Sequence, residues 1–544
     1  MSLQFIVVML SILVYIAVGL HAGRKVKNTA DYYVSGRQAP TLLIAGTLFA
    51  SMLSTNGFMG DTAWTYSGAI VNAVTLNAFC GAGYVIGVLF FGRYLRRTEK
   101  LTMPEYFGNR FNSKAVQKAA GVITVLSITS YLLAVTTGTG ILLSELINVN
   151  VNVGFFIAWV CFTSFTFYSG SSGVIITDTI MFLLFLGATV IAGPYMFSEA
   201  GGLSNLMTTL LNNPETPAGM FAYHGNFGQA GAAEGDKFGA VMYGLIYGLI
   251  WLITVGISPW QAGRNMMAKN EHVALRSSTV ACVCTTFFLT YLYLMSISVI
   301  PVMPAMEDSN RVIIWAAYNM MPKLLGCLVL AGIMAAGLSS ASTFLSVVGF
   351  TVTNDIFGLK FKDDRDKLVK TRIIMLAVSI VALLLAYGKF GSIRIISWFA
   401  STIIASSWCV VAFGSIWSKR LTARGALWSM AAGFLGFIVT KCLAGFGVVS
   451  IFKNFLDPFF IGLYLSAIFA VLGSMGNSPS KEEASVLEKI HTIPPSILSM
   501  AEYKRTFTYA NMLIALGLVV IVLLIAFWAV PYNNFLAAAA SVAP

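Results

Sequence analysis

Long apolar stretches alternate with short polar segments along nearly the whole chain. A helix needs about 20 apolar residues to cross a hydrocarbon core roughly 30 Å thick, so each stretch is a candidate membrane span. The pattern predicts about fourteen membrane helices. The predicted spans are 3–22, 41–66, 70–92, 116–146, 152–169, 173–197, 238–258, 273–303, 323–352, 369–388, 391–418, 425–447, 457–475 and 507–531.

The basic residues test this count, because cytoplasmic loops of membrane proteins are enriched in Lys and Arg. With the N-terminus placed outside, 27 of the 34 Lys and Arg residues fall in inward-facing segments. The distribution therefore predicts that both termini face outward. We expect the first apolar run to be a retained helix rather than a signal peptide, because no basic residue precedes it and no small-residue cleavage site follows it.

Composition narrows the class of protein. The chain is 57% hydrophobic and only 10% charged, whereas a soluble domain carries about a quarter charged residues. The net charge of +12 comes from short loops between apolar runs, so anionic lipid, and not nucleic acid, is the expected neighbour. The Cys and His residues show no metal-ligand or catalytic spacing, and there is no Walker motif. We therefore expect an all-α, multi-pass protein of the plasma membrane that is not an enzyme.

The stretch Thr47–Asp61 contains an unusual group of helix-weakening residues in mid-span, namely Ser54, Thr55, Asn56, Gly57 and Gly60. An interrupted helix is tolerated in a bilayer only where it lines a cavity or a site, because every backbone polar group needs a partner. Unwinding here would free carbonyl oxygens for a cation. The alternative is that these small residues form a helix-packing face.

A second predicted interruption lies in Ala335–Thr343, which has four hydroxyl residues in five positions. Ser339 and Thr343 are four residues apart and so share one helix face. Hydroxyls and freed carbonyls are suitable ligands for a dehydrated sodium ion near the membrane midplane. The alternative is that these hydroxyls bond back to carbonyls of the preceding turn.

Acidic residues at membrane depth are functional candidates. Asp61 follows the first interruption, although it could instead reach an outer aqueous vestibule. Asp178 is a candidate ligand or proton site, although it could be an acid favoured by a helix dipole. We expect Glu145, near an outer helix end, to be interfacial.

Four short motifs, together with the topology, resemble the sodium:solute symporter family, which includes proline, pantothenate, galactose and sialic acid transporters. The motifs are Thr29–Arg37 (TADYYVSGR), Leu101–Phe111 (LTMPEYFGNRF), Thr177–Asp178 and Thr353–Asp355 (TND). The resemblance implies a LeuT-type core of two inverted five-helix repeats. The implied division is 1–40 for an extra helix and inner loop, 41–197 for the first repeat, 198–237 for an outer loop, 238–418 for the second repeat, and 419–544 for three C-terminal helices with an inner linker.

The resemblance also implies where ions bind. It places a sodium site at the backbone carbonyls of Ala50, Leu53 and Ala336 and the hydroxyls of Ser339 and Ser340. It implies, for some members, a second sodium site, which here would consist of Asp178, Ser342 and Thr343. The segment Ser258–Arg264 keeps the family's Gln and Arg near the inner helix end.

By position in the family, the solute is expected against Asn56, Gly57, Gly81, Tyr84, Trp251 and Thr254. The implied function is sodium-coupled import of a small polar solute by alternating access. A carboxylated solute such as an amino acid, pantothenate or a short monocarboxylate fits best. The alternatives are a proton-coupled carrier of the same fold, with Asp178 as the proton site, and a membrane protein that senses a solute.

Overall fold

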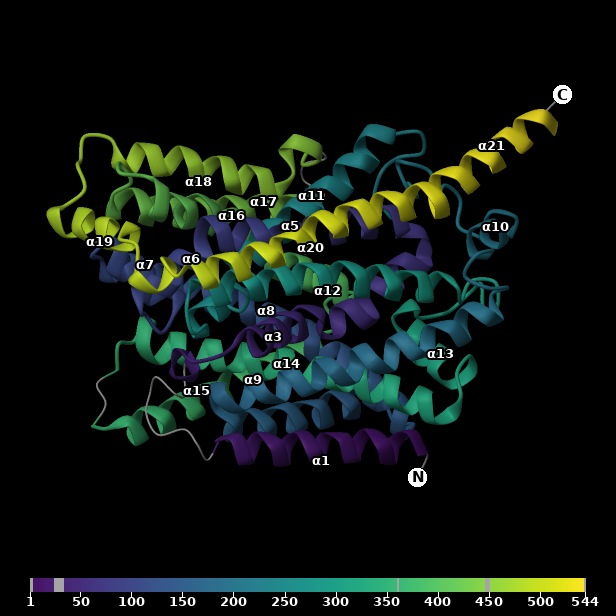
Figure 1. Ribbon diagram of the computed structural model, residues 1–544, viewed down its shortest axis with the longest axis horizontal. Helices are drawn as coiled ribbons and strands as arrows, with labels where there is room; N and C mark the ends of the chain where they lie inside the picture. Colours follow the sequence, from purple (N-terminus) through teal and green to yellow (C-terminus); the bar gives the residue numbers. More distant parts are fainter. Residues whose placement is uncertain (1–2, 24–33, 360–361, 446–450, 543–544) are drawn as a thin grey trace.

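The computed structural model describes residues 3–23, 34–359, 362–445 and 451–542. These residues form a bundle of helices that run mostly along one common direction (Figure 1). Within the described ranges there is no β-sheet, only an isolated bridge between Ala39 and Ala268. The residues Thr29–Tyr33, which begin the first family-like motif, lie outside the described residues.

The α-helices are α1 (Leu3–Gly23), α3 (Thr41–Thr55), α4 (Thr62–Trp64), α5 (Ile70–Gly87), α6 (Arg93–Thr98), α7 (Met103–Arg110), α8 (Lys114–Ile147), α9 (Val151–Glu199), α10 (Leu206–Leu211), α11 (Lys237–Ile257), α12 (Glu271–Ile297), α13 (Val312–Asn319), α14 (Lys323–Phe350), α15 (Asp364–Tyr387), α16 (Ile393–Trp417), α17 (Ala423–Gly445), α18 (Pro458–Ser474), α19 (Lys481–His491), α20 (Met500–Leu524) and α21 (Val530–Val542). Short π- or 3₁₀-helical segments join several of them, including η2 (Asn56–Asp61), η3 (Thr65–Ala69), η4 (Val88–Gly92), η5 (Ala262–Met267), η7 (Thr351–Ile356) and η10 (Ile525–Ala529).

The lengths of these helices suit a membrane protein. In the described part, ten helical stretches are long and apolar enough to cross a bilayer, and three shorter apolar helices accompany them. One of the ten, Thr41–Thr98, contains two of the predicted spans. Each predicted span thus overlaps a described helix, and the spans 152–169 and 173–197 both fall in α9. The count of fourteen crossings remains a prediction.

The two ends of the bundle differ. Helix α1 begins, and α21 ends, at the end that also holds α10 and α13, whereas α6, α7 and α19 lie at the opposite end (Figure 1). The latter three helices belong to segments predicted to face inward from their basic residues. The arrangement agrees with two termini on one side of the membrane, and their outward orientation remains a prediction.

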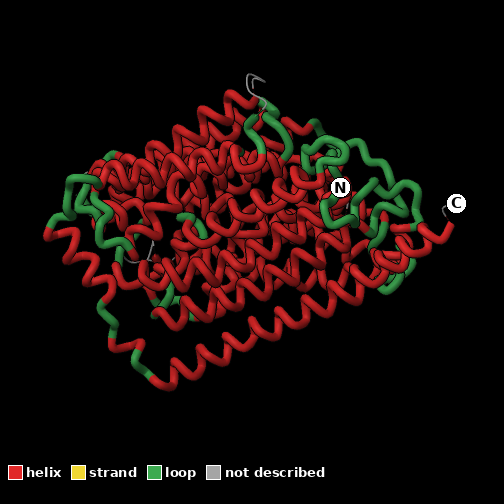
Figure 2. The backbone as a smooth tube through the Cα atoms, turned by 90° about the horizontal axis from the view of Figure 1, so that it is seen from above, coloured by secondary structure: helices red, strands yellow, loops and turns green. Residues whose placement is uncertain are grey.

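The C-terminal helix is longer than the predicted span 507–531. Helices α20 and α21, joined by η10, run along one flank of the bundle for its whole length (Figure 2). Most of their apolar side chains are exposed, among them Leu518 and Val522, each 62% exposed. Lipid is the expected cover for such a face in a membrane protein.

The first predicted interruption is confirmed. Ser54 leaves the helical conformation, with φ 40° and ψ −174°, at the point where α3 gives way to η2. Because a side chain in this conformation is strained, the surrounding structure must hold it there. The break falls in the middle of the span, between Leu53 and Asn56.

The second predicted interruption, at Ala335–Thr343, is wrong. Helix α14 continues through this segment without a non-helical residue. Hydroxyl residues are compatible with helix because they can bond to a carbonyl of the preceding turn, as Ser342 does to the Ser339 carbonyl at 2.9 Å.

The second break lies instead at the end of α11. Ser258 is extended, with φ −69° and ψ 151°, and the chain resumes as the 3₁₀-helix η5. Pro259 explains the position, because its ring disfavours the α conformation in the residue before it. The helices that open the two predicted repeats, α3 and α11, are thus both broken.

Candidate functional site

The break in α3 lies directly against the hydroxyl-rich part of α14. Gly337 makes the approach close, since a Cβ built there would be 3.2 Å from Thr55 Cγ2 and 2.5 Å from Thr139 Oγ1 of α8. Gly337 follows Ala336 and precedes Ser339 and Ser340 on α14. Gly337 therefore brings α14 close to the end of α3, within three positions of the predicted ligands Ala336, Ser339 and Ser340.

Two hydroxyl groups at this place have unused bonding capacity. Ser339 and Ser340 are fully buried; the Ser340 hydroxyl has no hydrogen-bond partner among the described residues, and the Ser339 hydroxyl lies beside Asp178 without a well-formed hydrogen bond. Ser342 differs, because its hydroxyl donates a hydrogen bond of 2.9 Å to the Ser339 carbonyl. A buried hydroxyl left without a partner costs about 1–3 kcal/mol, so a ligand that binds these oxygens would be stabilised here.

A positively charged side chain, that of Arg264, already lies among the residues predicted to bind a second sodium ion. Thr47 of α3 donates a hydrogen bond of 2.6 Å to Asp178 Oδ2, and an Arg264 guanidinium nitrogen lies 3.7 Å from the same oxygen. Arg264 also donates a hydrogen bond to the Thr343 hydroxyl. Asp178 and Thr343 are thus brought together as predicted, but by an arginine.

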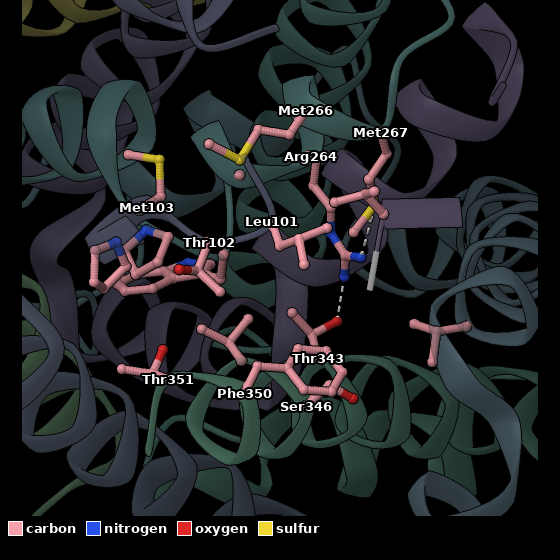
Figure 3. Close-up of a pocket in the computed structure, with 17 residues that line it drawn as sticks. Leu101, Thr102, Met103, Arg264, Met266, Met267, Thr343, Ser346, Phe350 and Thr351 are labelled. Atoms are coloured by element: carbon pink, nitrogen blue, oxygen red, sulfur yellow. Dashed lines mark hydrogen bonds between the residues drawn. The ribbon is translucent and has the colours of Figure 1, made fainter. Parts of the chain in front are cut away.

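A pocket lies beside this arginine at the α7 end of the molecule. Its wall comes from the start of α7, the segment around η5 and the last turns of α14. Arg264 points across it toward Thr343, and Met267 lies beside the arginine (Figure 3). The Arg264–Thr343 pair therefore separates the buried Asp178 from this pocket.

Two of the predicted solute residues lie on one face of α11. Trp251, Thr254 and Ser258 are spaced three and four residues apart, so their side chains share a face. The Thr254 hydroxyl donates to the Ser401 carbonyl of α16 at 3.1 Å. The hydroxyls of Ser258 and Ser401 are buried without a hydrogen-bond partner among the described residues, and Trp251 Nε1 lies beside the Tyr247 hydroxyl without a well-formed hydrogen bond.

Tyr131 of α8 connects this face to the break in α3. Its ring is 6.1 Å from that of Trp251 and 5.6 Å from that of Trp260. Its buried hydroxyl lies beside Ser54 without a well-formed hydrogen bond to any described residue. Tyr131 therefore lies between the Trp251 face of α11 and the break in α3.

Asn56 belongs to a hydrogen-bond network with Ser397 and Asp61. Its Oδ1 accepts a hydrogen bond of 2.8 Å from Ser397, and its amide nitrogen donates to Asp61 at 3.3 Å. Near this network, Arg394 lies 4.4 Å above the Trp64 ring and donates to the Tyr243 hydroxyl at 3.1 Å.

The remaining predicted solute residues have other neighbours. Gly57 faces Leu289 of α12. Gly81 faces the same helix, where its neighbours are Thr286 and Cys282. The Tyr84 hydroxyl bonds to the Leu48 carbonyl of α3 at 3.2 Å. Gly57 of η2 and Gly81 of α5 thus face α12, and Tyr84 of α5 contacts α3.

Sequence reasoning missed several residues of the site. Tyr131, Ser401 and Arg394 carry no local signal beyond being polar or aromatic residues within or beside an apolar span. Arg264 was noted as family-like but given no role. Glu145 behaves as expected for an interfacial acid, since it is partly exposed and pairs with Arg311 at 2.6 Å.

Structural comparison defines the class of protein. The fold is similar to that of a Na⁺-coupled sialic acid symporter in a substrate-bound, outward-open state, with a TM-score of 0.72, 17% identity, and coverage of 89% of this chain and 99% of the other. It is also similar to a nucleobase-cation-symport-1 family transporter, with a TM-score of 0.54, 11% identity, and coverage of 85% and 99%. The chain therefore has the LeuT-type fold of secondary transporters.

The sequence comparisons assign the family. The sodium:solute symporter family profile matches residues 32–433, so the chain belongs to the sodium:solute symporter family. The sodium/proline symporter of Escherichia coli K12 is 23% identical over 507 residues, which cover 89% of this chain and 96% of that protein. A high-affinity proline transporter of Bacillus subtilis 168 is 22% identical over 427 residues, covering 76% and 87%. The protein is a sodium-coupled symporter of the plasma membrane and not an enzyme.

Proposed function

We propose that the protein imports a small carboxylated solute together with a sodium ion held between α3 and α14. The proposed ligands are the carbonyl oxygens of Ala50, Leu53 and Ala336 and the hydroxyls of Ser339 and Ser340. The observation that carries the proposal is the pair of buried, unpartnered hydroxyls beside a broken helix.

The chemistry of these groups suits sodium. A hard monovalent cation is bound by neutral oxygens, and broken helices in transporters supply such oxygens near the midplane. The backbone departs from helix at Ser54, next to the proposed carbonyl ligand Leu53 of α3, and α14 supplies hydroxyls from an unbroken helix. Sodium would then satisfy oxygen atoms that otherwise stay unpaired in the core.

The solute is proposed to lie against polar and aromatic side chains near the break. Trp251 and Thr254 form one side, and Asn56 and Tyr131 lie toward α3 and α8. The half-helix that begins after the break presents its N-terminal amides, which favour an anionic group. Proline and sialic acid, the solutes named for two of the similar proteins, both carry a carboxylate. Gly57, Gly81 and Tyr84 would support the site indirectly, through α12 and α3.

Sodium binding and solute binding would be coupled because both proposed sites border the break in α3. Sodium orders the break in α3, and the same break borders the proposed solute site, so each ligand favours the other. Inward movement of one charge across 100 mV supplies about 2.3 kcal/mol, or about 50-fold accumulation of solute, before the sodium concentration gradient is added.

The test is uptake into proteoliposomes. Radiolabelled L-proline, sialic acid, pantothenate and acetate would each be supplied under an inward sodium gradient, a potassium gradient or a pH gradient. We expect one of these solutes to accumulate only with sodium. Accumulation driven by the pH gradient without sodium would instead establish the proton-coupled carrier. The Ser339→Ala, Ser340→Ala double variant is the control and should lose sodium-driven uptake.

A further inference from the structure

We propose that helix α19, together with the segment that joins it to α20, is a strap that restrains the opening of the pocket at the α7 end of the molecule. The family profile ends at residue 433, so this part of the chain lies outside the matched residues. The inference goes beyond the proposed function, because it concerns neither the sodium site nor the solute site.

Helix α19 is a short amphipathic helix with a well-defined start. Ser480 and Glu483 form a capping box, in which the side chain of each residue accepts a hydrogen bond from the backbone amide of the other. Leu487 and Ile490 follow Glu483 at helical spacing, so the three residues share the buried face of the helix. This face therefore holds α19 against the bundle, while the opposite face is exposed.

Arg97 of α6 joins three helices at this place. Its guanidinium pairs with the Glu271 carboxylate of α12, and it also donates a hydrogen bond of 2.9 Å to the Ile490 carbonyl of α19. The Arg97 and Glu271 side chains are only 9% and 3% exposed, so little water can replace these contacts. Ile490 lies in the last turn of its helix, where a carbonyl has no partner within the helix and attracts a cation. Helix α19 therefore completes a contact between one helix of each predicted repeat.

Arg110 of α7 forms a second junction of the same kind. Its guanidinium donates hydrogen bonds to the Ser415 carbonyl of α16 at 2.6 Å and to the Glu483 carbonyl of α19 at 3.2 Å. Arg110 is buried, so these carbonyl oxygens take the place of water around its charge. Helices α7 and α16 belong to different predicted repeats, so α19 again completes a contact between the two.

The strap is attached to the second predicted repeat at two further points. The His491 ring, at the end of α19, donates from Nε2 to the Ile416 carbonyl of α16 at 2.8 Å. Beyond the joining segment, Glu502 in the first turn of α20 pairs with Arg276 of α12 at 2.6 Å. These anchors lie before and after the joining segment, so the strap is held at both of its ends.

The pocket at the α7 end is bounded by parts of the chain that the two junctions tie. Residues 101–104, which line it, lie between Arg97 and Arg110 in the sequence, and other parts of the wall come from η5 and the last turns of α14. Helices α6, α7 and α19 lie together at this end of the bundle (Figure 1). Secondary transporters open such a pathway by moving one bundle of helices against the other. Opening this pocket therefore requires that the hydrogen bonds completed by α19 break or shift.

The test measures how readily the pocket opens in the purified protein without sodium or solute. Ser346 lines the pocket, so Ser346→Cys reports opening through its rate of reaction with a maleimide, and the chain without this change gives the background from the native cysteines (Figure 3). The added double substitution Leu487→Ser, Ile490→Ser weakens the apolar contact of α19. It should raise the labelling rate about 5-fold or more, which corresponds to the loss of one hydrogen bond. Glu502→Gln, which breaks the other anchor, should also raise the rate.

The matched control is Glu488→Ser with Lys489→Ser, because both side chains are exposed on the same helix. Its labelling rate should equal that of the parent. An unchanged rate in a folded Leu487→Ser, Ile490→Ser variant would overturn the strap, and so would an equal rise in the control. Where that double variant does not fold, an unchanged rate for Glu502→Gln overturns it. The proposed function is tested by sodium-driven uptake, so the two proposals can fail independently.

Discussion

The hydroxyls of α14 allow a prediction in which neighbouring, chemically identical substitutions have different effects. Ser340 and Ser342 are both fully buried on the same helix. The Ser342 hydroxyl has a partner at 2.9 Å, whereas the Ser340 hydroxyl has none among the described residues. Ser340 belongs to the proposed sodium ligands and Ser342 does not, so Ser340→Ala removes an ion ligand and Ser342→Ala removes only a hydrogen bond within α14.

The magnitude follows from the bonding state of each group. We take the contact between the Ser340 hydroxyl and sodium to be as strong as a hydrogen bond to a charged group, which contributes about 1.5–3 kcal/mol. Ser340→Ala should then weaken sodium binding about 10- to 150-fold. Without sodium, the same change removes an unsatisfied buried hydroxyl, and the unfolding temperature should stay the same or rise. Ser342→Ala loses an ordinary bond contributing about 1 kcal/mol, which slightly lowers stability at every sodium concentration.

Thermal unfolding of purified protein over a sodium titration measures both quantities at once. Bound sodium raises the unfolding temperature by mass action, so the midpoint of the rise reports affinity. We expect this midpoint to move for Ser340→Ala and to stay in place for Ser342→Ala. Equal shifts for the two variants would refute the assignment of Ser340, and would restore Ser342 as an ion ligand.

Two further predictions concern packing. A Cβ added at Gly87 would be 2.8 Å from the Gly256 carbonyl oxygen and nearer still to the Gly256 Cα. Gly87→Ala should therefore push α5 away from α11 and lower the free energy of unfolding by about 1–3 kcal/mol or more. Gly256→Ala, whose nearest neighbour would be 3.2 Å away, should be milder, and a reversed order of unfolding temperatures would contradict the close contact. Arg394→Gln and Trp64→Leu each break the 4.4 Å cation–π contact, so a double-mutant cycle should show coupling of roughly 0.5–2 kcal/mol. Strict additivity would show that this contact contributes nothing.

Much of the fold could be predicted because each membrane helix corresponds to a long apolar stretch of the sequence. The break at Ser54 was also predictable, since Ser, Thr, Asn and Gly follow one another beside an acid. The same reasoning failed at Ala335–Thr343, because a hydroxyl-rich segment packed closely through Gly337 stays helical. Composition shows that a segment has a low helix propensity, but its packing against neighbouring helices determines whether the helix is interrupted.

The site was less predictable than the fold. Asp178 and Thr343 were rightly placed near each other, but the arginine between them depends on how α11 ends. Pro259 marked that end in the sequence, yet the direction of the chain beyond it depends on tertiary packing. The unpartnered atoms of Tyr131 and Ser401 could not be foreseen, because a missing partner is a property of the three-dimensional structure alone.

The central claim is that one sodium ion binds between the broken helix and the hydroxyls of α14. The most direct test is a cryo-electron microscopy map of the protein in sodium buffer, at a resolution that shows single ions. The account predicts a peak surrounded by the carbonyl oxygens of Ala50, Leu53 and Ala336 and the hydroxyls of Ser339 and Ser340. A peak at Asp178 and Thr343, with those five oxygens turned away from one another, would contradict it.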